Sequence, residues 1–112
     1  MSAWAKRGRG VIRVQGVMNK LELSYAHELE NKKRSGLIEW YSFDAIKLRL
    51  AEKTFYTPDF LVMMRDGIME VHEVKGHWED DARVKIKVAA DKFPFIFKAI
   101  KKVRGQWEVE LF

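Results

Sequence analysis

The charged residues with the most suggestive spacing flank a short turn in YTPDFLVMMRDGIMEVHEVK, which spans residues 56–75. Asp59 precedes the first apolar run, and Glu73 and Lys75 end the second. Two apolar runs separated by Arg65-Asp66-Gly67 predict a β-hairpin. Successive side chains of a strand point to opposite faces, so Glu73 and Lys75 share one face. Whether Asp59 joins them depends on the length of the turn.

The turn allows two pairing registers. A two-residue Asp66-Gly67 turn sets Asp59 opposite Val74, so that its side chain faces away from Glu73. A three-residue loop, with Gly67 in the left-handed conformation, sets Asp59 directly opposite Glu73. The Cβ atoms of the two acids are then roughly 5 Å apart. We predict the three-residue loop.

Two carboxylates in that register repel each other unless a cation lies between them. Oxygen ligands suit Mg²⁺ or Mn²⁺, which keep water and accept substrate phosphates as further ligands. Such a metal lowers the pKa of its water and neutralises phosphate charge. Lys75 can orient or deprotonate the water, or stabilise charge on the phosphorus. Asp59, Glu73 and Lys75 are therefore predicted to hydrolyse a phosphodiester bond. The alternative is a turn residue beside Pro58 and an exposed cross-strand charge set.

The same residues resemble the motif of a known enzyme superfamily. Pro58-Asp59, thirteen residues and then Glu73-Val74-Lys75 resemble the PD-(D/E)XK nucleases. More narrowly, NKLELSYAHELE, YTPDF and HEVKG are similar to a small phage-encoded family that resembles Holliday junction resolvases. The resemblance covers residues 19–112 and implies a restriction-endonuclease-like αβββαβ core, an α/β fold with a central mixed sheet flanked by helices. It also implies a Mg²⁺- or Mn²⁺-dependent endodeoxyribonuclease that acts on branched DNA such as four-way junctions. A general or sequence-selective phage endonuclease and a non-catalytic DNA-binding module of the same fold are the alternatives.

The resemblance extends the metal site to two further positions. An acid on the first helix often completes the site in such enzymes, and Glu22 matches that position, alongside Asp59 and Glu73. The backbone carbonyl of Val74 is implied as another ligand. Glu22 also has a purely local interpretation, because Asn19-x-x-Glu22 is a capping box that starts a helix.

The remaining patterns predict the elements that position these residues. Leu21, Tyr25 and Leu29 recur every four residues, which predicts a helix with one buried face. Asp80-Asp81 and Pro94 bound a second helix, although VKIKV inside it also alternates like a strand. The predicted order is a helix over 20–34, a strand over 43–50, the hairpin, the second helix, and strands over 95–103 and 107–112. This order predicts a small mixed α/β sandwich, a single domain over 19–112 that follows a basic arm over 1–18.

The charge of the chain is unevenly distributed. The net charge is +5; residues 1–20 contain five basic and no acidic residues, and residues 21–80 contain eight basic and twelve acidic residues. Residues 81–112 contain eight basic and four acidic residues. The ends are therefore expected to bind a polyanion, although solvated surface lysines are the plainer interpretation. The residues predicted to contact DNA are Arg7, Arg9, Arg13, Lys20, His77 and Lys85.

Composition excludes several other classes of site. The chain has no cysteine, which excludes disulfides, thiolate zinc sites and cysteine nucleophiles. The longest apolar run, residues 60–64, is far too short to span a membrane. We expect a cytoplasmic protein of a phage-infected or bacterial cell. Because a resolvase makes two coordinated cuts, the resemblance also implies a homodimer, for which LIEWY is a candidate surface.

Overall fold

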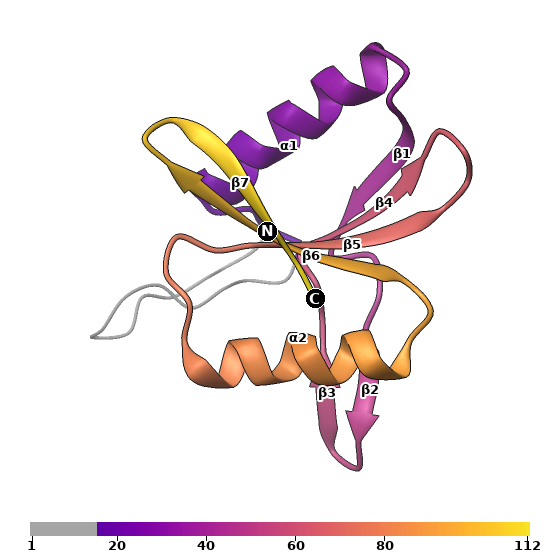
Figure 1. The fold of residues 1–112 in the computed structure, drawn as a ribbon, viewed down its shortest axis with the longest axis vertical. Helices are drawn as coiled ribbons and strands as arrows, with labels where there is room; N and C mark the ends of the chain where they lie inside the picture. Colours follow the sequence, from indigo (N-terminus) through magenta and orange to yellow (C-terminus); the bar gives the residue numbers. More distant parts are fainter. Residues whose placement is uncertain (1–15) are drawn as a thin grey trace.

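The computed structural model describes residues 16–112, and Figure 1 shows how their elements are arranged. The described part of the chain contains two helices, a mixed five-stranded sheet and a separate two-stranded hairpin, which confirms the α/β class. The helices are α1 (Lys20–Arg34) and α2 (Asp80–Lys92). The strands are β1 (Ile38–Phe43), β2 (Leu48–Ala51), β3 (Thr54–Tyr56), β4 (Phe60–Met64), β5 (Met69–Val74), β6 (Ile96–Val103) and β7 (Gln106–Leu111).

The sheet has the strand order β1-β4-β5-β6-β7. The β5–β6 pair is parallel and joined through α2, while the other neighbouring pairs are antiparallel. Along the chain, α1, β1, β4, β5, α2 and β6 follow the expected αβββαβ order. The β2–β3 hairpin is inserted between β1 and β4, and β7 adds an edge strand.

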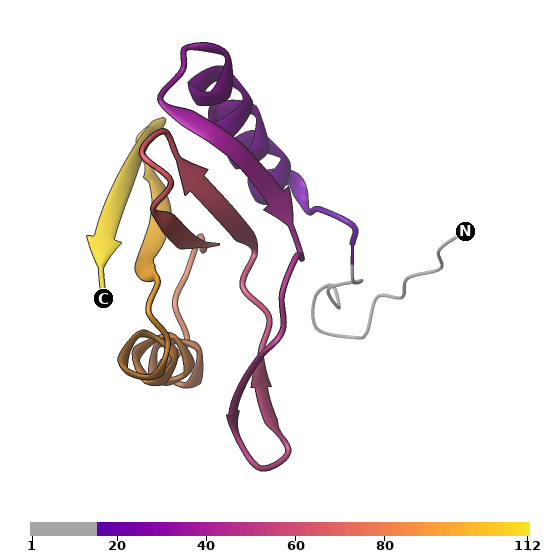
Figure 2. The same cartoon turned by 90° about the vertical axis from the view of Figure 1, so that its right-hand side faces the viewer.

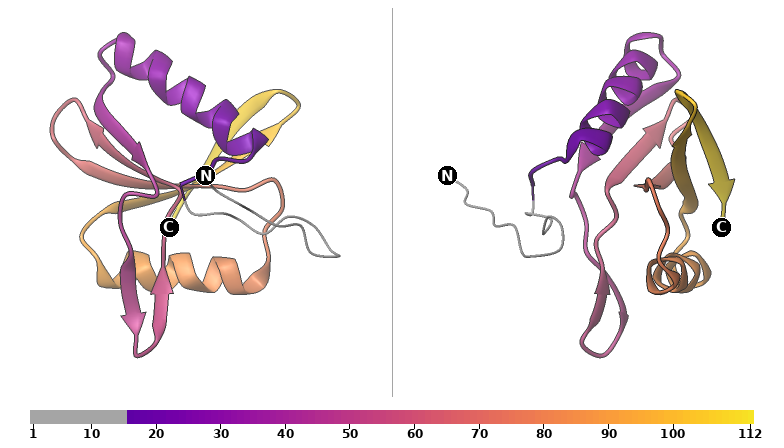
Figure 3. Two further views of the ribbon diagram at one scale, coloured as in Figure 1. Left: turned by 180° about the vertical axis from the view of Figure 1, so that it is seen from behind. Right: turned by 90° about the vertical axis from the view of Figure 1, so that its left-hand side faces the viewer.

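Helices cover both faces of the sheet. Figure 1 shows α1 on one side and α2 on the other, and Figures 2 and 3 show the β2–β3 hairpin projecting on the side of α2. Each face has its own apolar core. Tyr25 and Leu29 of α1 pack on Phe60 and Val62, whereas Ile86 of α2 belongs to the cluster on the opposite face. The alternating strand residues thus supply two cores, and the polar side chains on each face lie beside one of them.

The predicted first helix is confirmed at both ends. Asn19 accepts a hydrogen bond from the Glu22 N–H at 2.8 Å, and the Glu22 side chain accepts one from the Asn19 N–H at 2.9 Å. These bonds satisfy two of the N–H groups that a helix start leaves unpaired. The second helix is also confirmed. It ends at Lys92 because the residue before Pro94 avoids the helical conformation.

The predicted strand over 43–50 is wrong in its bounds, because Phe43 ends β1 and residues 48–50 belong to β2. The first strand of the sheet is β1, which begins at Ile38, within the LIEWY stretch that we named as a candidate dimer surface. The chain leaves the sheet at Asp44, whose φ is 54°, and the alternating residues that follow enter β2. Leu48 and Leu50 are buried there in the core on the α2 side, so their alternation reflects a real strand outside the main sheet.

The turn between β4 and β5 has the predicted three residues. The Gly67 N–H donates to the Met64 carbonyl at 2.8 Å, and the Met64 N–H donates to the Ile68 carbonyl at 2.8 Å. Gly67 has a φ of +89°, which costs an L-residue about 1–2 kcal/mol.

Substituting Gly67 tests whether this backbone conformation sets the register. No atom lies within 4 Å of a β-carbon at this position, so the cost of Gly67→Ala is conformational. We expect urea unfolding to show a loss of about 1–2 kcal/mol for Gly67→Ala and a smaller loss for Gly67→Asn, because asparagine tolerates this region. Equal stability of wild type and Gly67→Ala would contradict the assignment.

Candidate metal centre

The β4–β5 register brings the two predicted acids together. Phe60 pairs with His72 and Val62 pairs with Glu70, so the residues before and after this pairing, Asp59 and Glu73, lie opposite each other. The predicted register is therefore confirmed. Both acids lie at the end of the hairpin remote from its turn, on the face of the sheet that carries the β2–β3 hairpin and α2.

Each of the two acidic side chains accepts a hydrogen bond from a backbone N–H on the other side of the hairpin. The Asp59 N–H donates to Oε1 of Glu73 at 3.1 Å, and the Val74 N–H donates to Oδ2 of Asp59 at 2.8 Å. The exposed fractions of Asp59 and Glu73 are 2% and 6%. These backbone bonds fix both carboxylates in place, so neither needs to be ordered when a ligand binds.

Burial disfavours the charged form of Glu73. Desolvation raises the pKa of this carboxyl, although Lys75, the Tyr56 hydroxyl and the Asp59 N–H act in the opposite direction. The Tyr56 hydroxyl donates to Oε1 at 2.8 Å, and Lys75 Nζ lies 3.4 Å from Oε2. A divalent cation would supply the missing charge, and the oxygen donors of Asp59 and Glu73 suit Mg²⁺ or Mn²⁺.

Lys75 lies between the buried acids and solvent. Its side chain is 36% exposed, compared with 8% for Glu73. An ammonium group in this position can contact Glu73 from one side and an anionic ligand from the other. The trio therefore combines two fixed carboxylates with a cation on a long side chain, which are the groups required to place a phosphate beside a metal ion.

Comparison with known protein families shows the family of the chain. A family model described as a protein of unknown function, DUF1064, matches residues 10–110. The chain belongs to the DUF1064 family. No curated protein and no solved structure shows significant similarity to it. The resemblance to PD-(D/E)XK nucleases therefore stays a proposal for this DUF1064 chain.

Glu22 lies in the first turn of α1, but it does not complete a group of three carboxylates with Asp59 and Glu73. Among residues 16–112, no set of three acidic or histidine side chains is close enough together to hold a metal ion. Glu22 is buried and its carboxylate takes part in the capping box. The neighbouring Leu21 lies 3.7 Å from where a β-carbon of Gly76 would be, so α1 begins beside the segment that follows Lys75. The role of Glu22 as a third ligand stays a prediction.

The other predicted residues occupy different positions. Val74 donates its N–H to Asp59, and the N–H and C=O of a strand residue point to the same side, so its carbonyl is directed toward β4. Lys20 is exposed at the start of α1, and Lys85 is exposed on α2. His77 is exposed in the loop after β5. The predicted DNA contacts in the basic arm, Arg7, Arg9 and Arg13, lie outside the described residues.

Sequence reasoning missed Tyr56 as a partner of Glu73. Tyr56 ends β3 and pairs with Leu48, so its orientation depends on the inserted hairpin rather than on the β4–β5 turn. The available signal was the position of Tyr56 just ahead of Pro58-Asp59, at the end of an aromatic segment. The sequence pattern did not identify the β2–β3 hairpin. Without that hairpin, there was no reason to expect the Tyr56 hydroxyl to point toward Glu73.

A second polar cluster lies on the opposite face of the sheet, under α1. His72 Nε2 is 2.8 Å from Glu70 Oε1, His72 Nδ1 is 2.7 Å from the Tyr25 hydroxyl, and Lys98 Nζ is 2.9 Å from Glu70 Oε1. Burial lowers the pKa of His72 although Glu70 opposes it, so the ring is neutral at pH 7. Burial alone would raise the pKa of Glu70, but bonds from His72 and Lys98 outweigh it and lower it. We interpret this cluster as structural.

The cluster predicts that stability falls on mild acidification. The pKa of His72 is lower in the folded chain than its ordinary value of 6.5, so the unfolded chain binds more protons below that pH. Stability is therefore present above pH 6.5 and is lost as pH falls toward the folded pKa. Urea unfolding between pH 7.5 and 5.5 should show a smaller loss for His72→Gln than for wild type. The raised pKa of Glu73 has the opposite effect on stability, but Glu73 is present in both proteins, so it does not contribute to the difference between their losses. Equal losses would contradict this.

None of the described helices is long and apolar enough to cross a membrane.

Proposed function

We propose that the chain is a metal-dependent endodeoxyribonuclease that hydrolyses DNA phosphodiester bonds, with branched DNA as its preferred substrate. The observation that carries the proposal is the convergence of Asp59 and Glu73. Both are buried and held by backbone N–H groups, with Lys75 directed outward beside them. Two acids buried side by side repel each other, and a divalent cation between them would offset that repulsion.

Each residue of the site would have a separate role in the reaction. Asp59, Glu73 and the Val74 carbonyl would hold Mg²⁺ or Mn²⁺, and Glu22 is the candidate for a further ligand through water. The metal, when bound, supplies a Lewis acid that neutralises phosphate charge and acidifies its water. Lys75 contacts the phosphate or the attacking water and offsets charge on the phosphorus. Tyr56 holds Glu73 in position through its hydroxyl.

The substrate preference and the assembly rest on the resemblance to resolvases. Symmetric cleavage of a four-way junction requires two sites, so we propose a homodimer. Basic side chains outside the site, including Lys20 and Lys85, would contact the DNA backbone without reading its sequence.

A labelled four-way junction tests the proposal alongside a linear duplex of the same sequence. Each is incubated with wild type or Asp59→Asn in Mg²⁺, in Mn²⁺ and in EDTA. Asparagine can still accept the Val74 N–H, so the variant should fold. We expect metal-dependent cutting by wild type, faster on the junction, and none by Asp59→Asn. Equal cutting of both substrates would remove the branch preference alone. DNA binding without any cutting would instead indicate a non-catalytic binding module.

Salt dependence tests the predicted contribution of the basic arm. Each phosphate contact releases counterions, so the slope of log affinity against log salt changes by about 0.9 per contact. Replacing Arg7, Arg9 and Arg13 together by Gln should flatten the slope by about 2–3. Fluorescence anisotropy with labelled duplex at several NaCl concentrations measures it. An unchanged slope would show that these arginines do not contact phosphate.

A further inference from the structure

A pocket of about 370 Å³ lies on the same face of the sheet as the metal site, one strand away from it. Glu73 pairs with Ala99 of β6, and Ala99 pairs with Glu110 of β7. Paired residues share a face of the sheet, so these three form a row from the metal site into the pocket. Ala99 is 2% exposed and its small side chain leaves the floor of the pocket open.

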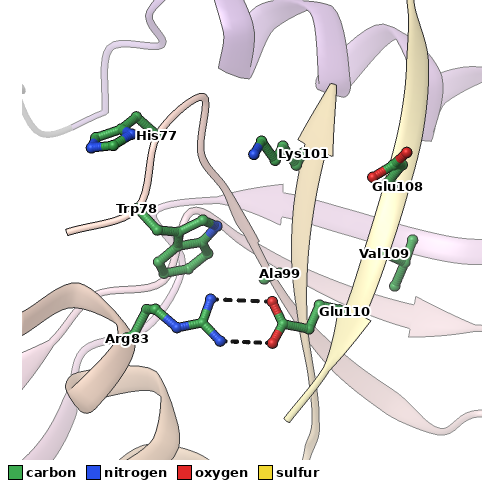
Figure 4. A pocket seen from close by; sticks show the side chains of 8 residues that line it. All are labelled: His77, Trp78, Arg83, Ala99, Lys101, Glu108, Val109 and Glu110. Atoms are coloured by element: carbon green, nitrogen blue, oxygen red, sulfur yellow. Dashed lines mark hydrogen bonds and ion pairs between the residues drawn. The ribbon is translucent and has the colours of Figure 1, made fainter. Parts of the chain in front are cut away.

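Two opposing walls enclose the pocket. Figure 4 shows His77, Trp78 and Arg83 on one side, and Lys101, Glu108 and Glu110 on the strands across from them. The first wall comes from the β5–α2 loop and α2, and the loop begins at Lys75. The pocket and the metal site are therefore connected along the chain as well as across the sheet.

Arg83 connects the two walls of the pocket beside Trp78. Arg83 makes two hydrogen bonds to Glu110, at 3.2 and 2.7 Å, which tie α2 to β7. The same guanidinium lies 5.7 Å from the ring of Trp78 and 5.2 Å from the ring of Phe112. The Trp78 and Phe112 rings are 6.2 Å apart. The half-buried Trp78 lines the pocket and offers part of its flat apolar ring to it.

The charges of the pocket favour a base over a phosphate. Arg83 is compensated by Glu110, which removes it as a free phosphate contact. Glu108 adds a second carboxylate, which repels a phosphate but accepts hydrogen bonds from amino groups of a base. Lys101, which pairs with Glu108 across the strands, can donate to ring or carbonyl acceptors. An aromatic platform with mixed donors and acceptors on the opposite wall matches a heterocyclic base.

We propose that this pocket binds one unpaired nucleobase, stacked on Trp78, from the nucleotide next to the phosphate held at Asp59, Glu73 and Lys75. The inference rests on the proposed nuclease function and gives its substrate selectivity a physical cause. A base inside a duplex cannot enter the pocket without leaving the stack. The preferred DNA therefore carries an unpaired nucleotide beside the scissile bond, as at a bulge, a flap or a branch point.

The test compares binding of a duplex with a single-nucleotide bulge and of the fully paired duplex. The bulged base is 2-aminopurine, whose fluorescence falls when it stacks on an aromatic ring. Ca²⁺ replaces Mg²⁺ so that a divalent cation can occupy the metal site, and a denaturing gel of the same samples checks that the DNA stays uncut. Wild type should bind the bulged duplex at least about tenfold more tightly than the paired duplex and quench the 2-aminopurine. Equal affinities without quenching would overturn the proposal.

Variants assign the preference to Trp78. Trp78→Leu keeps apolar volume against Phe112 but removes the ring face, so it should lose both the preference and the quenching. Trp78→Phe should restore most of both. Phe55→Leu is the matched control, because Phe55 is a 39% exposed aromatic residue on β3 that does not line the pocket, and it should behave as wild type. A preference retained by Trp78→Leu would overturn the proposal. The nuclease proposal is tested separately, by the cleavage assay. A protein that shows the binding preference but cuts no DNA would refute the nuclease function and leave the base pocket supported.

Discussion

The Glu73→Gln variant should lose cleavage activity by at least about a thousandfold, because a neutral amide is a poor ligand for Mg²⁺ and Mn²⁺. Its folding should not suffer. The glutamine side chain would retain an oxygen that accepts from the Tyr56 hydroxyl and the Asp59 N–H, as Glu73 does at 2.8 and 3.1 Å. The variant also removes a buried charge that burial makes unfavourable, so its free energy of unfolding should equal or exceed that of wild type.

Opposite effects on activity and stability distinguish a functional site from a structural one. Cleavage rates with saturating Mn²⁺ and urea unfolding in EDTA measure the two quantities on the same preparations. Glu79→Gln is the matched control, because Glu79 is exposed at the start of α2 and its side chain makes no capping bond. It should leave both unchanged. A Glu73→Gln protein that is active, or that is much less stable than wild type, would favour a structural role for Glu73.

The Glu70→Ala variant should have the largest effect on stability, a loss of about 3 kcal/mol or more. Glu70 is 5% exposed and accepts from both His72 and Lys98. Its removal leaves the buried His72 N–H without an acceptor, which costs about 1–3 kcal/mol, and leaves a cavity in addition. Lys98, with a quarter of its side chain exposed, can turn to solvent and limits the loss.

Urea unfolding at pH 7.5 measures this loss. Glu28→Ala is the matched control on the surface of α1, where the 3.9 Å pair with Lys32 is worth at most about 0.5 kcal/mol. At temperatures where Glu70→Ala stays folded, its cleavage rate should remain close to that of wild type, since Glu70 faces α1 and Glu73 faces the other side. A loss below about 1 kcal/mol would show that the cluster under α1 contributes little.

Local signals predicted the parts of the fold that depend on local chemistry. The capping box of Asn19 and Glu22 placed α1, and the left-handed Gly67 set the β4–β5 register and with it the meeting of Asp59 with Glu73. Both devices act within a few residues, so their meaning does not depend on the rest of the chain.

Signals that depend on distant packing were missed. β1 has a register irregularity between Ile38 and Trp40, which places exposed residues next to each other and disrupts the alternation that identifies a strand. The contacts of Tyr25 with His72, and of Arg83 with Glu110, join positions far apart in sequence. Charge and residue type gave no indication of which partners would meet, so both the cluster under α1 and the base pocket required the structure.

The central claim is that Asp59 and Glu73 jointly bind a divalent cation. Anomalous scattering from a crystal soaked in Mn²⁺ tests it most directly. We expect a manganese peak about 2.1 Å from a carboxylate oxygen of each residue, and no such peak in Asp59→Asn crystals. Manganese bound elsewhere, with Asp59 and Glu73 contacting only the protein, would rule out a shared cation.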